Sequence, residues 1–226
     1  FGAEQNVWRF TLDVSGLIST PNPVLQLTNI LQQQENTTVE TAVHVVLPSE
    51  GPRLFVGTDR GLVMANSSDF AGGFDSSWIF DINDAEDYVM PADAMDSALA
   101  ARVQALVVDG PRDASGEITS PQTLWVGTRG GVHQFDLVVG PSNPLGAFSY
   151  DRMYNEAEFS ANDVQSILPL GDEVIIGSQW GSWALDADHS RSSGVEPDHT
   201  RVPGRIVDMT VLDVDGQPML FAALDP

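Results

Sequence analysis

The chain contains no cysteine and no lysine. Without cysteine there is no disulfide, no cysteine-ligated zinc or iron–sulfur site and no thiol nucleophile. The 10 basic residues are all arginine and face 32 acidic residues, which gives a formal net charge of −22. Because a surface this negative repels phosphate, we expect no nucleic-acid partner. The longest apolar runs fall far short of the roughly 20 residues that span a bilayer, so we expect no membrane insertion.

The composition otherwise fits a folded protein with a core. Of the 226 residues, 42% are hydrophobic, which is enough to pack an interior despite the charge. The 20 glycines and 14 prolines interrupt the chain too often for long helices, and the apolar runs are rich in β-branched side chains. We therefore predict an all-β fold.

A short motif built on Gly-Thr-x-x-Gly recurs along the chain. Residues 54–63 match residues 124–133 closely and residues 174–183 more loosely, and in each copy two glycines stand four residues apart. The glycine pairs are Gly57 and Gly61, Gly127 and Gly131, and Gly177 and Gly181. Internal repetition of this kind predicts one structural unit that is used several times.

Each copy of the motif predicts a β-hairpin. The Gly-Thr-x-x-Gly segment turns the chain, so Gly57, Gly127 and Gly177 are expected to mark equivalent bends in successive sheets. A nearly continuous apolar strand precedes each hairpin, and a more polar fourth strand completes each unit. We expect the preceding strands at residues 42–47, 103–108, 164–168 and 206–212, and fourth strands within residues 77–82 and 146–153.

Two incomplete copies extend the series to both ends of the chain. Ala223 takes the first glycine position in residues 220–223, and Asn6 takes the second glycine position in residues 1–10. Measured between first glycine positions, the repeats span 55, 70, 50 and 46 residues. Units of about this length are typical of the four-stranded antiparallel blades of a β-propeller.

We therefore predict an all-β protein, a β-propeller of four-stranded antiparallel blades with about four repeat units in one domain or propeller segment. The expected units cover residues 1–20, 21–69, 70–140, 141–190 and 191–226. Two arrangements fit this count. Either the N-terminal strands complete the last blade and close a four-bladed ring, or the chain is part of a propeller of about six to eight blades, which we favour.

The copy at residues 124–136 reads Leu-Trp-Val-Gly-Thr-x-Gly-Gly-Val-x-x-Phe-Asp and resembles the repeat of the two-component-regulator propeller family. Residues 162–167 resemble the strand that precedes that signature. The chain departs from the family pattern at Ala65, Ile175 and Ala223. The resemblance implies a bacterial β-propeller, periplasmic or extracellular, used for sensing or binding, and it carries over no catalytic residue.

An acidic segment is the one candidate metal site. Asp81, Asn83, Asp84, Glu86 and Asp87 place oxygen donors at alternating spacing, as a loop that holds Ca²⁺ would. We expect no other cofactor. The Asp-Gly pair at residues 215–216 is instead typical of a hairpin turn between two strands.

The remaining reactive and aromatic side chains point to packing. The four histidines, at positions 44, 133, 189 and 199, are too scattered for a metal motif, and we expect His44 and His133 to be packed or hydrogen-bonded within strands. Trp125, Trp180 and Trp183 lie on or beside the motif, so we expect them to pack between blades.

The function that we predict is a non-enzymatic binding, sensory or scaffold module. It would act through loops or protein–protein contacts, with a protein partner or the remaining propeller blades. The alternative is a propeller enzyme, a lyase or hydrolase, with a cation or a histidine–carboxylate site near the central channel. The enzyme requires His133, His189 or His199 to meet carboxylates in one pocket.

Overall fold

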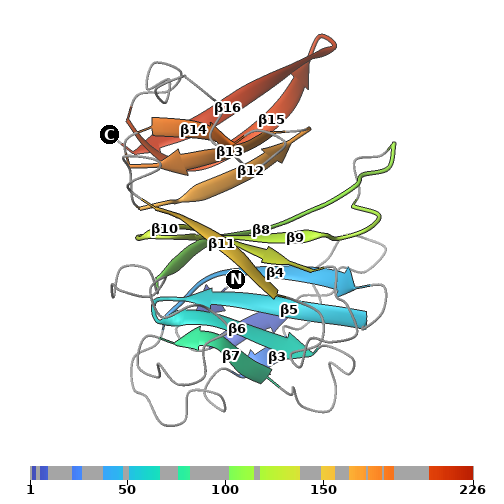
Figure 1. The fold of residues 1–226 in the computed structure, drawn as a ribbon, viewed down its shortest axis with the longest axis vertical. Helices are drawn as coiled ribbons and strands as arrows, with labels where there is room; N and C mark the ends of the chain where they lie inside the picture. Colours follow the sequence, from blue (N-terminus) through green and yellow to red (C-terminus); the bar gives the residue numbers. More distant parts are fainter. Residues whose placement is uncertain are drawn as a thin grey trace.

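The computed structural model describes residues 2–3, 6–9, 22–26, 38–47, 51–66, 76–81, 102–114, 118–137, 149–155, 163–171, 173–179, 181–185 and 204–225. Within these residues the fold is all-β, with five antiparallel sheets and no helix (Figure 1). None of the described residues forms a helix that is long and apolar enough to cross a membrane.

Two sheets have the predicted four strands, each joined in chain order. The first contains β4 (Val39–Leu47), β5 (Gly51–Thr58), β6 (Gly61–Asn66) and β7 (Ser76–Asp81). The second contains β8 (Val103–Asp109), β9 (Thr123–Thr128), β10 (Gly131–Asp136) and β11 (Ser149–Asn155). All four expected strand types therefore occur in these sheets.

The other three sheets are shorter. One contains β12 (Ser166–Leu170), β13 (Glu173–Ser178) and β14 (Gly181–Leu185). A two-stranded sheet contains β15 (Arg205–Val214) and β16 (Gln217–Asp225). The N-terminal sheet contains β1 (Gly2–Ala3), β2 (Asn6–Arg9) and β3 (Asn22–Gln26). Within the described residues these three sheets contain two or three strands each, and a fourth strand in each of them stays a prediction.

Strand register confirms that the motif copies are equivalent. The first glycine of each copy pairs across the hairpin with the residue five positions later, as Gly57 does with Leu62 and Gly127 with Val132. Gly2 pairs in the same way with Val7, and Asn6 takes the place of the second glycine opposite Ala3. The incomplete N-terminal copy therefore has the register of the complete ones.

The turn of the motif is held by its hydroxyl residue. The buried Thr128 hydroxyl donates to the Gly131 carbonyl at 3.0 Å and accepts from the Gly130 amide at 3.1 Å. Thr58 makes the corresponding bonds in the first complete copy, and Ser178 donates to the Gly181 carbonyl in the third. One hydroxyl thus satisfies backbone groups that the tight turn would otherwise leave unpaired.

The first glycine of each copy lies inside a strand, and the prediction of a bend at Gly57, Gly127 and Gly177 is wrong. The glycine is needed because the next sheet approaches it closely. A Cβ on Gly127 would lie 2.8 Å from Cγ1 of Val164, and one on Gly177 would lie 2.7 Å from Cγ2 of Ile206. Both distances are shorter than atoms in van der Waals contact allow.

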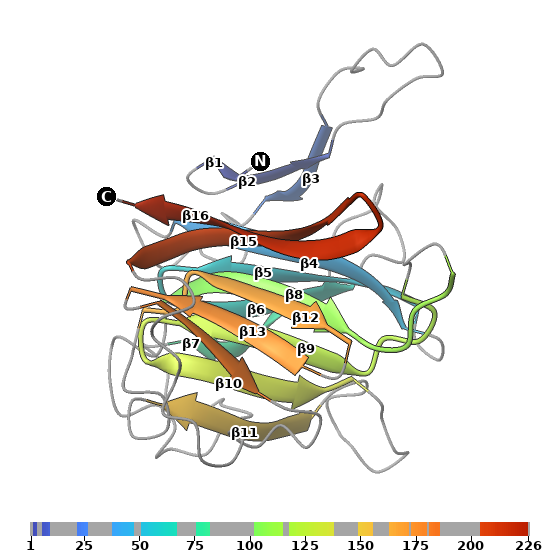
Figure 2. The ribbon, with the colours of Figure 1, turned by 90° about the horizontal axis from the view of Figure 1, so that it is seen from above.

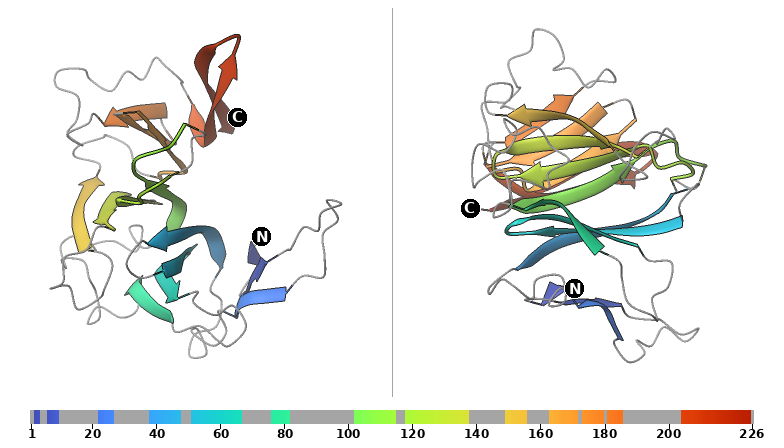
Figure 3. Two further views of the ribbon diagram at one scale, coloured as in Figure 1. Left: turned by 90° about the vertical axis from the view of Figure 1, so that its right-hand side faces the viewer. Right: turned by 60° about the horizontal axis from the view of Figure 1, so that its bottom comes forward.

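The sheets stack one on the next (Figures 1 and 2). Buried apolar clusters lie between successive sheets from β4 to β16. Trp125 and Trp183 pack between the β8–β11 and β12–β14 sheets, as predicted, and Ile206 and Met209 pack between the last two sheets. Seen end on, the sheets form a curved row in which β4 and β8 lie on the concave side (Figure 3, left). The first strand of each sheet is therefore also an edge strand.

Candidate functional site

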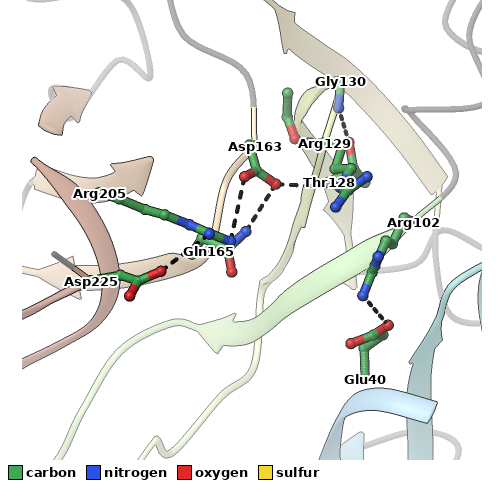
Figure 4. A network of polar contacts seen from close by, with 10 residues as sticks. Glu40, Arg102, Thr128, Arg129, Gly130, Asp163, Gln165, Arg205 and Asp225 are labelled. Carbon is green, nitrogen blue, oxygen red and sulfur yellow. Dashed lines mark hydrogen bonds and ion pairs between the residues drawn. The ribbon is translucent and has the colours of Figure 1, made fainter. Parts of the chain in front are cut away.

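Charged side chains of successive sheets meet at one end of the first strands (Figure 4). Arg102, Asp163 and Arg205 each stand immediately before the residue that packs near a repeat glycine. Because the three positions are equivalent in the repeat, stacking of the sheets brings them to the same end of the molecule. We call this group the polar row; its members are Glu40, Arg102, Arg129, Asp163, Gln165, Arg205 and Asp225.

Asp163 is the centre of the polar row. Its carboxylate lies 3.6 Å from Nε of Arg129 and 3.7 Å from Nη2 of Arg205, and it accepts a 2.9 Å hydrogen bond from Gln165. Arg205 continues to Asp225, with Nη1 3.3 Å from Oδ2. Three sheets are joined in this way, since Arg129 follows β9, Asp163 precedes β12 and Arg205 begins β15.

The backbone at Asp163 has an uncommon conformation. Its φ is 64°, in the left-handed region that Asp and Asn tolerate better than most residues with a side chain. This conformation directs the Asp163 amide to the Arg129 carbonyl at 3.0 Å and the Val164 amide to the Thr128 carbonyl at 3.0 Å. The start of β12 is therefore attached to the β9–β10 turn by main-chain bonds as well as by charge.

The polar row is suited to aligning sheets. A separate pair joins Arg102 Nη2 to Glu40 Oε1 at 2.6 Å and links the first two complete sheets. With this pair included, three guanidinium groups face three carboxylates, and their charges balance. The arginine side chains are about one-third to two-fifths exposed, so each ion pair contributes only about 0–1 kcal/mol. We assign the polar row a positioning role between sheets.

A second candidate surface is the outer face of the β15–β16 hairpin, the face directed away from β12–β14. Thr210 pairs with Phe221 and Leu212 with Met219, so these four side chains share one face. Met209 and Ile206 point the other way and are buried against the preceding sheet. Of the outer apolar side chains, Leu212 is 51% exposed and Phe221 is 43% exposed.

Comparison with equivalent positions shows how unusual this exposure is. Phe55 and Trp125 occupy the position of Phe221 in their own sheets and are completely buried, because a third strand and a further sheet cover them. Ile175, in the third copy, is buried as well. The second strand of each repeat thus carries a large apolar side chain that the next sheet buries. On β16 none of the described residues buries the equivalent side chain, Phe221.

A third feature is a groove of about 510 Å³ between β4 and β8, at the opposite end of these strands from the polar row. Residues 43–46 of β4 and 106–108 of β8 line it, together with Arg112, Ile118 and Pro121 from the β8–β9 connection. Most of its lining side chains are apolar, but close to half of the exposed groove surface is polar, and His44 and Arg112 are its charged or ionisable lining among the described residues.

The predicted calcium site lies almost entirely outside the described residues. Asp81 ends β7, and its side chain is not described; Asn83, Asp84, Glu86 and Asp87 lie outside the described residues, so the calcium loop stays a prediction. Within the described residues, no three His, Asp or Glu side chains form a group that could hold a metal ion.

The histidines have different surroundings. His133 is completely buried on β10, with its ring centroid 5.9 Å from that of Phe80, whereas His44 is exposed on β4. His189 and His199 lie outside the described residues. The histidine–carboxylate pocket of the alternative enzyme therefore stays a prediction.

Comparison with known proteins adds no identification, since no protein-family model, no curated protein and no solved structure matches this chain. Sequence reasoning also missed the polar row. An alignment of the repeats could have found it. If the repeats are aligned on the residue that packs against the first glycine of the preceding copy, Arg102, Asp163 and Arg205 fall in one column.

Proposed function

We propose that the protein is a non-enzymatic binding or scaffold module of the β-propeller type, whose outer face on β15–β16 binds a further antiparallel sheet of the same kind. One observation carries the proposal: Phe221 is exposed where its repeat equivalents Phe55 and Trp125 are buried. Soluble proteins seldom leave a cluster of large apolar side chains uncovered unless it contacts a partner.

The edge of β16 supports the same conclusion. Among the described strands, β16 pairs only with β15, whereas β5, β9 and β13 each lie between two neighbours. An unpaired strand edge presents main-chain donors and acceptors that another strand can pair with. A covering sheet would thus gain backbone hydrogen bonds along β16 and bury Leu212, Met219 and Phe221 on its face.

The interface is a continuation of one that the chain already contains. Between complete sheets, a repeat glycine faces a β-branched residue of the next sheet, as Gly127 faces Val164. On β16 the equivalent position is Ala223, whose Cβ occupies the space of that contact. We therefore expect the covering sheet to present a residue smaller than valine at this point.

The wider reading as a periplasmic or extracellular sensor of the two-component-regulator type rests on the resemblance of residues 124–136. The curved row of stacked sheets, with first strands on its concave side, is the arrangement expected for consecutive blades (Figure 3). The partner is then either the remaining blades of a ring or a separate protein that completes it.

Site-specific photo-crosslinking in the native host tests the proposal. A photoreactive phenylalanine analogue replaces Phe221 in one variant and Val46, which is 59% exposed on β4, in the control. We expect position 221, and not position 46, to crosslink to a peptide with the repeat pattern, mapped by mass spectrometry. Equal crosslinking at the two positions, or adducts only to chains without strand-forming repeats, would contradict the proposal.

A further inference from the structure

The outer face of the β15–β16 hairpin, the last sheet of the stack, combines large and small side chains (Figure 1). One strand pair extends this face beyond the four side chains already described, since Asp208 pairs with Ala223. Phe221 therefore has Thr210 beside it across the hairpin and Ala223 two residues further along β16. A surface that packs densely on this face must place a small side chain over Phe221.

The centre of the outer face carries no charge. The chain as a whole has 32 acidic against 10 basic residues, so two copies repel each other over most of their surface. Asp208 lies at one end of the face, and the side chains between it and the turn are all uncharged. They are Thr210, Leu212 and Val214 of β15 and Gln217, Met219 and Phe221 of β16. Two copies can therefore approach here without placing carboxylates against each other.

Ala223 limits which surface can cover the hairpin. Between successive sheets, the residues that face the repeat glycines are Val103, Val164 and Ile206. Val39 has the equivalent register at the start of β4. All four are valine or larger, whereas the Cβ of Ala223 calls for a smaller residue. The first strands described in this chain therefore do not fit on β16 in the way that they fit on one another.

The same face of a second copy does fit when two hairpins stack face to face about a two-fold axis along their length. Each β16 then lies over β15 of the other copy, so that Phe221 faces Thr210 of the second copy. Ala223 faces Asp208 of the second copy, which is smaller than valine and stays at the rim, in contact with solvent. A large side chain thus meets a small one at each of these positions.

From these observations we infer that the outer face of β15–β16 binds the same face of a second copy of this chain, in a two-fold symmetric dimer. The inference rests on the proposed function, because it names the partner of that same surface. Strands of 10 and 9 residues give this face a length of about 30 Å and an area of about 300 Å², below the roughly 800 Å² per partner of a stable interface. We therefore expect a weak dimer, with a Kd of about 10–100 μM.

Sedimentation velocity of the whole purified chain, between about 1 and 500 μM at about 0.15 M salt, tests the dimer. We expect the mass to rise with concentration to that of two chains. Phe221→Glu places a charge at the centre of the contact and should weaken association by about tenfold or more. Val46→Glu is the matched control, because it places the same charge on another exposed valine-sized site, and it should change the Kd less than about twofold. A monomer at every concentration, or equal weakening by both variants, overturns the inference.

Exchanging the large and the small side chain tests the two-fold arrangement itself. Thr210→Phe alone crowds two phenylalanines together, and Phe221→Thr alone leaves a gap between two threonines, so each should weaken the dimer by about tenfold. The double variant restores a large side chain over a small one and keeps the same cross-strand pair within the hairpin. Its Kd should lie within about threefold of that of the original chain. A double variant that binds no more tightly than the single variants overturns the arrangement.

Photo-crosslinking of an equal mixture of ¹⁴N-labelled and ¹⁵N-labelled protein identifies the contact. The photoreactive phenylalanine analogue replaces Leu212, which is 51% exposed on the same face. We expect mixed-isotope crosslinks to residues 205–225. Mixed crosslinks to residues 38–66 instead would show head-to-tail stacking and overturn the inference. A chain that crosslinks in its host to a different repeat protein, but not to itself, would overturn the second copy as partner and leave the proposed function intact.

Discussion

Replacing the repeat glycine at the middle sheet interface by alanine tests the stacking directly. In Gly127→Ala the new Cβ lies 2.8 Å from Cγ1 of Val164, 3.1 Å from Cβ of Ala105 and 3.3 Å from Cδ1 of Ile167. Only the Ile167 contact involves the end of a flexible side chain. Val164 is β-branched and buried, so turning its methyl group away from the new Cβ is unfavourable.

The expected cost follows from these contacts. Overpacking a dense core by a methyl group typically costs about 1–3 kcal/mol, and Gly→Ala offsets this by about 0.4–1 kcal/mol through the unfolded chain. We expect Gly127→Ala to lower the free energy of unfolding by about 1–2 kcal/mol. Urea titration followed by tryptophan fluorescence measures it, because Trp125 and Trp183 are buried in the same interface.

A double-mutant cycle with Val164→Ala shows whether the cost arises from this contact. Removing the Cγ atoms of Val164 takes away the one contact below 3.0 Å. Val164→Ala alone destabilises through the cavity it leaves, but we expect the double variant to be more stable than the sum of the single effects by about 1 kcal/mol. Additivity within about 0.5 kcal/mol would refute the view that Gly127 is required by the approach of the next sheet.

Three further substitutions address the turn and the polar row. Thr128→Val keeps the side-chain shape but leaves the Gly130 amide and the Gly131 carbonyl without their hydroxyl partner. Urea unfolding should therefore show a free energy of unfolding that is lower by about 1–3 kcal/mol. An unchanged midpoint would mean that these two backbone groups find other partners. Asp163→Asn keeps a residue that tolerates a φ of 64° but removes the negative charge between Arg129 and Arg205. The free energy of unfolding should therefore fall by about 1 kcal/mol or less at low salt, and this difference should vanish near 1 M salt. A loss that is independent of salt would show that the ion pairs are not the cause. Asp163→Ala should cost about 1 kcal/mol more than Asn at every salt concentration, because alanine lacks the polar side chain that eases this backbone conformation.

The hairpins were predictable from sequence because their determinants are local. The Thr128 hydroxyl bonds to groups two and three residues further on, and Asp215-Gly216 forms the β15–β16 turn with both residues at positive φ. Such features depend on neighbouring residues only, so a motif of a few residues predicts both the turn and the register. The location of the first glycine was misjudged for the opposite reason, since the approach of Val164 is not visible near Gly127 in the sequence.

The sequence by itself determined the all-β character of the chain, the positions of the hairpins and the equivalence of their registers. Only the tertiary structure decided that Glu40 meets Arg102 from 62 residues away, that Asp163 lies between two arginines, and that the β8–β9 connection lines a groove beside β4 and β8. It also decided that Phe221 stays exposed while Trp125 is buried. These features depend on how closely whole sheets pack, which is set by side-chain volumes across each interface and not by the conformational preferences of any one segment.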